Sequence, residues 1–67
     1  MGDVDTLKAE VKKLSAQAMQ AKMDLHDLSE ELPVGVEKVM DVAQRVTSAY
    51  ANLAAKKAEL KMQEAIT

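Results

Sequence analysis

The stretch LHDLSEELP, residues 25–33, decides how the chain folds because it carries a helical pattern into the chain's only proline. Leu25, Leu28 and Leu32 follow one another at spacings of three and four residues, the period of one face of an α-helix. Pro33 disfavours helical geometry at the residue before it, so the helix should end at about Leu32. The stretch therefore predicts a helix that stops at the proline.

Apolar residues continue this spacing back to the start of the chain. The predicted seam of the first helix is Val4, Leu7, Val11, Leu14, Ala18, Ala21, Leu25, Leu28 and Leu32. Steps of three and four in alternation form the heptad pattern of a helix that packs along another helix. We predict a first helix over residues 4–32, about 42 Å long at 1.5 Å per residue.

A second apolar seam follows the proline. Gly35 can act as a cap or hinge, so we predict a hinge over residues 33–36 and a second helix over residues 37–65. Its predicted seam is Val36, Val39, Ala43, Val46, Tyr50, Leu53 and Leu60, widened by Val42 and Ala49 and interrupted by Lys57. A short link forces two long helices to lie antiparallel. The predicted fold is all-α, a single helical-hairpin domain over residues 1–67.

A chain of 67 residues buries little surface alone, so self-association is a natural route to stability. Small and soft apolar residues lie off the two seams, and these side chains allow close helix packing or fill irregular gaps. We predict a homodimer joined through the terminal halves into a four-helix arrangement, with the interface formed by Ala9, Ala16, Met19, Ala51, Ala55, Ala58 and Met62. The alternative is that alanine is abundant because it favours helix.

Composition excludes several classes of protein. The chain has no cysteine and one histidine, which rules out disulfides and a catalytic zinc site within one chain. The net charge of −2 does not favour nucleic acid or an anionic membrane as partner. The N-terminal residues lack the basic and apolar regions of a signal peptide, and no apolar run approaches the ~20 residues of a membrane span. We expect a cytoplasmic location.

The hinge region is acidic. Residues 24–41 hold six of the eleven acids and one of the nine bases. His26 lies off the seam on the outward side of the first helix, with Glu30 one turn along the same face. We predict a protein-docking site at this end, formed by His26, Asp27, Glu30, Glu31 and Pro33.

A metal site is the alternative for the same histidine. A histidine and a carboxylate four residues apart can share one divalent ion, although two ligands make a weak site. His26 and Glu30 would hold such an ion. A metal ion added for crystallisation could also bind there, so its presence would not prove a function. No resident cofactor is expected.

Catalysis finds little support in the sequence. Ser15, Ser29 and Ser48 have no evident base beside them, and one outward histidine makes no triad. Two slender helices offer no deep pocket in which paired carboxylates would separate their pKa values. We predict that the chain is not an enzyme.

Two motifs resemble a known family. LHDLSEELP, followed by DVAQRVTSAYANL at residues 41–53, resembles the Rop-like family of short proteins encoded within bacterial nitrogen-fixation operons. The family's first motif typically reads LHDLAE, an acidic or small residue, then LP, and its second helix carries a VA…Y-x-A-Y-x-x-L pattern. The matching residues are Leu25, His26, Asp27, Leu28, Glu30, Leu32, Pro33, Val42, Ala43, Ala49, Tyr50 and Leu53. The departures are Val34-Gly35-Val36, where the family usually has a polar capping segment, and Thr47, where an aromatic is more usual.

The resemblance implies a function that the residues alone do not give. It implies a non-enzymatic accessory role in nitrogen fixation, as a small dimeric adaptor that docks on nitrogenase or on its cofactor-assembly proteins. Two other functions stay open. One is an RNA-binding hairpin modulator with a basic face on the first helix (Lys8, Lys12, Lys13, Gln17, Gln20 and Lys22), and the other is a metal carrier or sensor that uses His26.

Overall fold

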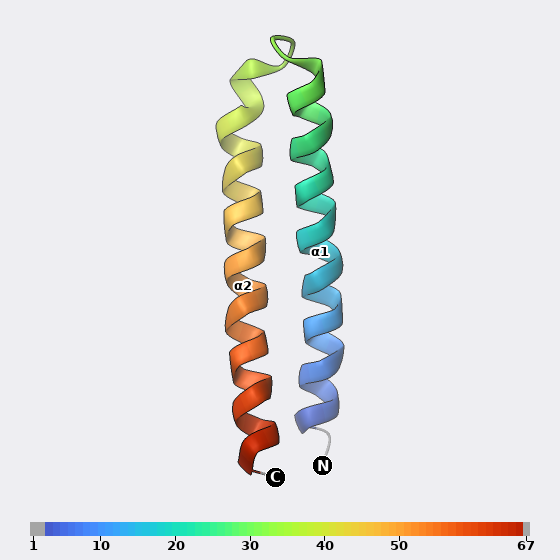
Figure 1. The fold of residues 1–67 in the computed structure, drawn as a ribbon, viewed down its shortest axis with the longest axis vertical. Helices are drawn as coiled ribbons and strands as arrows, with labels where there is room; N and C mark the ends of the chain where they lie inside the picture. The colour runs from blue at the N-terminus through green and yellow to red at the C-terminus, as the bar shows by residue number, and fades with distance from the viewer. Residues whose placement is uncertain (1–2, 67) are drawn as a thin grey trace.

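The computed structural model describes residues 3–66, so the ends of the predicted domain at residues 1–2 and 67 lie outside this range. Within it, α1 (Asp3–Glu31) is followed by a turn, the short 3₁₀ helix η1 (Val36–Lys38) and α2 (Val39–Ile66). The two long helices lie side by side and antiparallel, with both chain ends at the end away from the hinge (Figure 1). Residues 3–66 contain no strand. The predicted all-α hairpin is confirmed.

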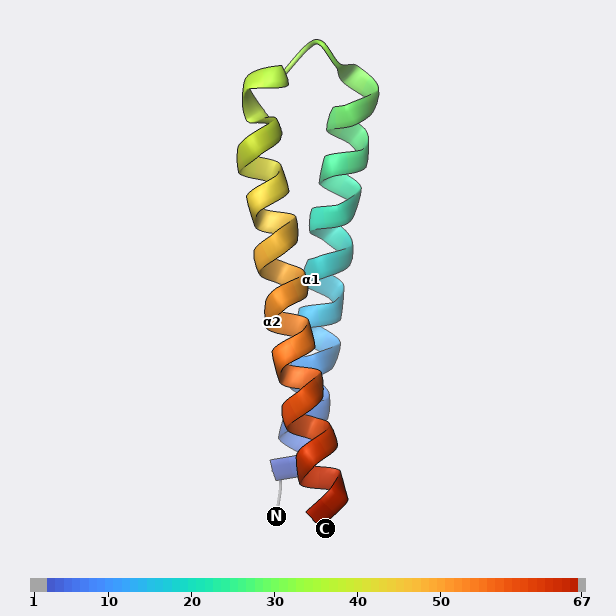
Figure 2. The same ribbon diagram turned by 60° about the vertical axis from the view of Figure 1, so that its left-hand side comes forward.

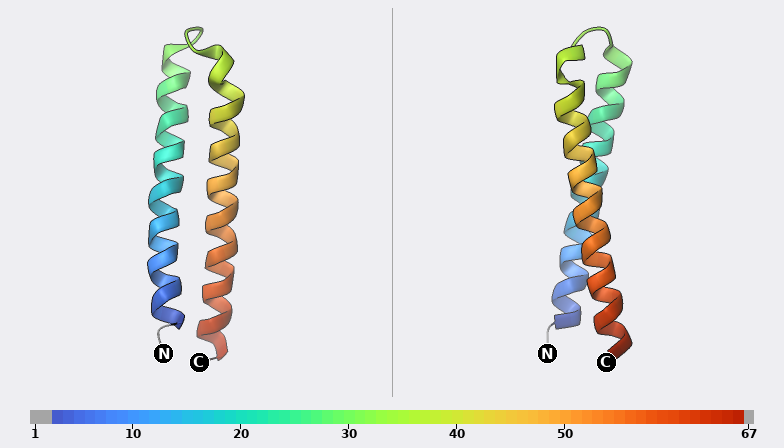
Figure 3. Two further views of the ribbon diagram at one scale, coloured as in Figure 1. Left: turned by 180° about the vertical axis from the view of Figure 1, so that it is seen from behind. Right: turned by 90° about the vertical axis from the view of Figure 1, so that its left-hand side faces the viewer.

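The hairpin is a narrow rod with principal extents of 51 × 14 × 12 Å. Turned views show that α1 and α2 cross at a small angle along their length (Figure 2, Figure 3). Such a crossing lets the side-chain ridges of one helix fit the grooves of its neighbour along a shared seam.

The seam of α1 follows the sequence pattern. Leu7, Ala18 and Ala21 are buried. The other predicted positions up to residue 28 are half-buried, namely Val4, Val11, Leu14, Leu25 and Leu28. Leu32 departs from the prediction, with 42% of its surface exposed. Because α1 ends at Glu31, the turn carries Leu32 away from the seam.

The seam of α2 was predicted correctly in part. Leu53 is buried, and Val39, Val42, Ala43, Val46, Ala49 and Leu60 are half-buried. Val36 and Tyr50 were wrongly placed in this seam, since they are 60% and 40% exposed. Val36 belongs to η1, before the continuous α2 heptad begins, and Ala49 takes the position that we assigned to Tyr50.

Lys57 was also wrongly placed. It is exposed and does not interrupt the seam, whereas the side chain of Lys56 is only 27% exposed. A heptad step of three from Leu53 leads to position 56, so Lys56 occupies a seam position in the open half of the hairpin.

The hinge is a compact turn built around one glycine. The Val34 N–H donates to the Glu31 carbonyl at 2.9 Å, and the Lys38 N–H donates to the Gly35 carbonyl at 2.9 Å. Gly35 has φ +80°, in the left-handed region, and a Cβ there would lie 2.9 Å from Leu28 Cδ1. The turn therefore requires glycine for its backbone conformation and for its close approach to α1.

Neither α1 nor α2, over the described residues, combines the length and apolar character of a membrane-spanning helix.

Candidate functional site

The last two turns of α1 bring three chemically active side chains together at the hinge end. His26 Nδ1 lies 3.7 Å from Asp27 Oδ1, and His26 Nε2 lies 3.9 Å from Glu30 Oε2. One ligand atom from each of the three residues lies within 4.8 Å of the others. The helical spacing that we used to place His26 beside Glu30 is thus correct, and Asp27 joins them from the adjacent position.

These three side chains point into solvent. The side chains of His26, Asp27 and Glu30 are all more than two-thirds exposed, at 68%, 73% and 69%. α1 positions them outward because Leu25 and Leu28 occupy the seam on its other side. At this exposure the ion pairs contribute little to stability, so the fold does not depend on them.

The other predicted docking residues lie at the same end. Glu31 and Pro33 are exposed where α1 passes into the turn. Over the described residues, the side chains of Glu31, Glu37 and Asp41 have no ion-pair partner. The hinge end therefore presents acidic groups that the hairpin itself does not neutralise.

Charges in the open half pair across the two helices. Lys8 Nζ lies 4.0 Å from Glu64 Oε2, and Lys56 Nζ lies 3.7 Å from Glu10 Oε2. Lys56 also donates a hydrogen bond to Glu59 Oε2 at 3.3 Å. The bond to Glu59 and the negative charges of Glu10 and Glu59 raise the pKa of Lys56 above its ordinary value. Lys56 thus occupies a seam position as a cation, and its charge is balanced by Glu10 of α1 and Glu59 of α2.

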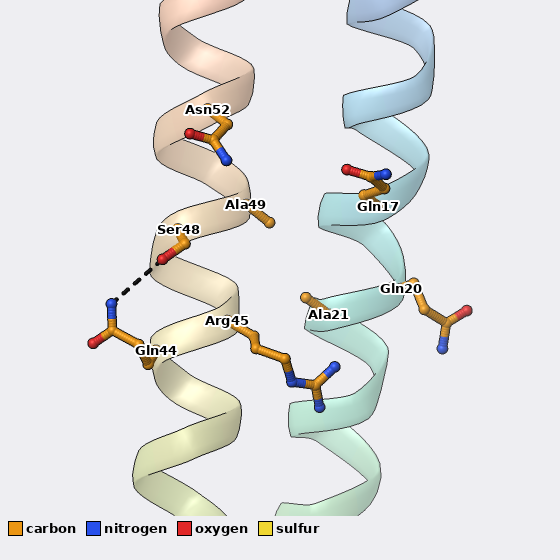
Figure 4. Close-up of a pocket in the computed structure, with 8 residues that line it drawn as sticks. All are labelled: Gln17, Gln20, Ala21, Gln44, Arg45, Ser48, Ala49 and Asn52. Carbon is orange, nitrogen blue, oxygen red and sulfur yellow. Dashed lines mark hydrogen bonds between the residues drawn. The ribbon is translucent and has the colours of Figure 1, made fainter.

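A groove of about 390 Å³ lies between the two helices near mid-length, and sequence reasoning missed it. Ala21 and Ala49 face each other across it (Figure 4). Polar side chains line the rest, namely Gln17, Gln20, Gln44, Arg45, Ser48 and Asn52. Arg45 Nη1 lies 3.2 Å from Asp24 Oδ2, an interhelical pair that we also did not predict. The signal for the groove was two alanines at opposed seam positions, which leave space between the helices.

The seven residues predicted to form a dimer interface are all exposed. Their heptad positions place them around the rod, not on one flat surface. Ala51, Ala55, Ala58 and Met62 share one stripe along the outer back of α2, whereas Ala9, Ala16 and Met19 lie on the outer side of α1, so the two sets face in different directions. The dimer interface formed by these residues therefore stays a prediction, with three of its residues on α1 and four on α2.

The serines of the described residues have no side chain beside them that could act as a base. Between residues 4 and 66, no polar or charged residue is buried. The Ser29 hydroxyl donates to the His26 carbonyl at 2.7 Å, and the Ser48 hydroxyl accepts a hydrogen bond from Gln44 at 3.3 Å. None of the described serines therefore contacts a histidine or carboxylate side chain that could activate it.

The fold and its hinge place this chain among small antiparallel helical hairpins. Residues 2–65 match the model of the Rop-like family, and the chain belongs to that family. The resemblance drawn from LHDLSEELP and the α2 motif is thus confirmed. No solved structure matches the chain.

Curated relatives are of similar size. A UPF0437 protein of Azorhizobium caulinodans is 48% identical over 65 residues, covering 97% of this chain and 94% of the relative. A UPF0437 protein of Nostoc sp. is 41% identical over 61 residues, covering 91% and 86%. A protein of Frankia alni, named UPF0437 protein in nifX-nifW intergenic region, is 44% identical over 52 residues, covering 78% of this chain and 63% of the relative.

Proposed function

We propose that this chain is a non-enzymatic accessory protein of nitrogen fixation, which docks through its hinge end onto nitrogenase or onto proteins that assemble the nitrogenase cofactor. The proposal rests on the exposed cluster that the side chains of His26, Asp27 and Glu30 form. These side chains contribute little to the stability of the fold. The name of the Frankia alni relative, which refers to the nifX-nifW region, supports the nitrogen-fixation context.

The chemistry of the hinge end indicates what kind of surface it would meet. Six acids and one base between residues 24 and 41 favour a basic patch on the partner, because complementary charge speeds encounter and fixes orientation. Val34, 70% exposed at the tip, adds an apolar contact beside these charges. A mixed acidic and apolar tip suits protein docking better than binding to a polyanion.

Affinity capture from cells grown with and without fixed nitrogen tests this function. The tagged chain should capture a nitrogenase component or a cofactor-assembly protein, identified by mass spectrometry, only from nitrogen-fixing cells. Capture should fall with His26→Ala and with Asp27→Asn. Lys12→Ala is the matched control, because Lys12 is exposed on the same stripe of α1, fourteen residues from His26.

Wild-type capture by both hinge variants would show that the hinge motif does not contact the partner. Capture of the same proteins from cells supplied with fixed nitrogen would contradict the link to nitrogen fixation. It would still support docking on those proteins.

A metal carrier or sensor is the second candidate. This candidate is supported by the geometry of His26, Asp27 and Glu30, each of which offers one ligand atom within 4.8 Å of the others. Titration with Zn²⁺ or Ni²⁺ should then show one site per chain with micromolar affinity, which His26→Ala abolishes without loss of helicity. Binding only at millimolar metal would identify the site as adventitious.

RNA binding receives less support. Lys8 of the predicted basic face pairs with Glu64. The remaining residues of that face lie at different heptad positions around α1, so they do not form one basic stripe.

A further inference from the structure

The tip of the hairpin gathers apolar side chains that its own packing leaves in water. Of the nine large apolar side chains that are exposed among the described residues, four lie between residues 32 and 40. These tip residues, which are 42% to 78% exposed, are Leu32, Val34, Val36 and Met40. The other five are spread along the two helices. Apolar side chains that gather in one exposed patch mark an interaction site, whereas scattered ones do not.

The hinge keeps the four tip residues close together. Leu32 and Val34 lie in the turn that closes the end of the rod, whereas Val36 belongs to η1 and Met40 to the first turn of α2 (Figure 2). Val36 and Met40 are four residues apart, so helical spacing places them on one side of the chain. The rod is only 14 × 12 Å across, so one partner surface of ordinary size would cover the whole tip.

The turn holds its own backbone in place. The N–H groups of Val34 and Val36 donate to the carbonyls three residues before them, at 2.9 Å and 3.3 Å. Between them, Gly35 approaches Leu28 so closely that a Cβ would lie 2.9 Å from Cδ1. A partner would therefore meet apolar side chains on an ordered turn, and binding would not have to order that backbone.

Acidic residues border the tip. Three of the four tip residues have an acidic neighbour in the chain, and these acids are Glu31, Glu37 and Asp41. All three are exposed, and none has an ion-pair partner among the described residues. Lys38 is the only base between residues 24 and 41. The apolar tip thus lies beside negative charge that the hairpin does not neutralise.

Glu31 lies where its own helix disfavours it. The last turn of α1 ends at Glu31 and contains no basic residue. The C-terminal end of a helix carries partial negative charge, which opposes a carboxylate there. A basic group on a partner would stabilise this carboxylate, whereas α1 does not.

We propose that the four tip residues insert into an apolar pocket on a protein partner, and that Lys and Arg side chains at the rim of that pocket pair with Glu31, Glu37 and Asp41. This inference rests on the proposed docking function and adds which side chains hold the partner and what its surface must offer. Burial of the apolar side chains supplies the binding free energy, whereas the charges at the rim mainly affect the rate of encounter. The same acids oppose adsorption to an anionic membrane.

Photo-cross-linking from single cysteines tests the occupant of the tip, because the chain has no cysteine of its own. The full chain with Val34→Cys or Met40→Cys is labelled with a benzophenone and irradiated in an extract of nitrogen-fixing cells. Both positions should cross-link to one protein, at a peptide with apolar residues beside Lys or Arg. Met62→Cys is the matched control, since Met62 is 71% exposed at the open end of α2 and Met40 is 78% exposed at its start. The control should not yield that peptide.

The cross-linked product decides between the possible occupants. A lipid, a second copy of the chain or an acidic peptide would overturn the proposal, as would the absence of a product from both tip positions. A basic and apolar peptide from a protein outside the nitrogenase system would support the tip surface and reject the proposed function.

The affinity for the purified cross-linked protein tests the apolar side chains. The double variant Val34→Ser/Met40→Ser should raise the Kd at least about tenfold at low and at high salt, mainly through faster dissociation. Met62→Ser should leave the Kd unchanged. Wild-type affinity of the double variant, together with a loss of capture by His26→Ala, would overturn the apolar contact and leave the proposed docking function standing.

Replacing the three acids tests the rim. The triple variant Glu31→Gln/Glu37→Gln/Asp41→Asn should associate more slowly at low salt and lose most of the salt dependence of association. Its melting temperature should not fall, because an uncharged residue at position 31 no longer opposes the helix dipole. An unchanged salt dependence would overturn the pairing of these acids with a basic rim.

Discussion

The two halves of the hairpin use their charges differently. In the open half, Lys8 and Lys56 pair with carboxylates on the opposite helix. In the hinge half, Asp24 also pairs across the helices with Arg45, but the His26 side chain forms ion pairs with Asp27 and Glu30 of its own helix. Glu31, Glu37 and Asp41 are exposed and have no ion-pair partner among the described residues. Charges that cross the seam help to fix the register of α1 against α2, whereas charges that stay on one exposed face contribute little to the fold. The hinge end thus differs from the open end in keeping several acidic groups exposed without an ion-pair partner among the described residues.

The largest expected effect comes from the core of the open half. Leu53→Ala should lower the free energy of unfolding by about 2–4 kcal/mol, because Leu53 is one of the few fully buried side chains between the helices. Leu32→Ala in the hinge half should cost less than about 1 kcal/mol, since Leu32 is largely outside the seam. Urea denaturation followed by circular dichroism measures both. Equal losses would mean that the hinge leucine packs as a core residue.

The second effect tests the hinge turn. Gly35→Ala should destabilise the hairpin by about 1–3 kcal/mol, because alanine in the left-handed region is strained and its methyl group would press on Leu28. Val34→Ala, one position away and exposed, is the control and should have almost no effect. Thermal unfolding measures the difference, and a neutral Gly35→Ala variant would contradict the turn geometry.

The third effect tests the paired cation in the seam. The folded-state pKa of Lys56 is raised, so its favourable interactions are fully present below pH 10.5 and are lost as pH rises through the folded-state pKa. The wild type should therefore lose thermal stability above that pH more steeply than Lys56→Met. Because a charged seam residue costs stability while specifying register, Lys56→Met should also melt at a higher temperature at pH 7. Parallel pH profiles of the two proteins would show that the Lys56 ion pairs do not contribute.

The smallest effect on stability belongs to the hinge. His26→Ala and Asp27→Asn should each change the free energy of unfolding by no more than about 0.5 kcal/mol, since both side chains are exposed. Their stability is read by the same urea titration, and their docking by affinity capture. A large stability loss would assign these residues to the fold and would undermine their proposed role in docking.

The sequence predicted α1 better than α2, and the reason is local. The α1 heptad offers one apolar residue at nearly every seam position, so its register has no close competitor. In α2, the adjacent pairs Val42-Ala43 and Ala49-Tyr50 allow two registers. We assigned the larger Tyr50 to the seam. The opposing seam residues Ala18 and Ala21 are small, however, and the smaller Ala49 packs against α1 at this level. Pattern alone could not weigh the size of the opposing residues.

The hinge cluster was predictable because its geometry is local to one helix. The contact of His26 with Glu30 follows from their spacing along α1. The groove between the helices and the pairing of Asp24 with Arg45 depend on how two helices are aligned, which no local spacing reveals. What the hinge binds depends on the surface of another molecule, so it could only be proposed.

The covalent link at residues 32–35 closes one end of the hairpin and leaves the other free to fray. Local opening should therefore begin where the helices start and finish, and should spread towards the turn. In native-state hydrogen exchange, backbone amides in the last turn of α2 should exchange first, and those near Leu25 and Val42 should exchange most slowly. Exchange would thus proceed along the rod from the open end of the hairpin towards the turn.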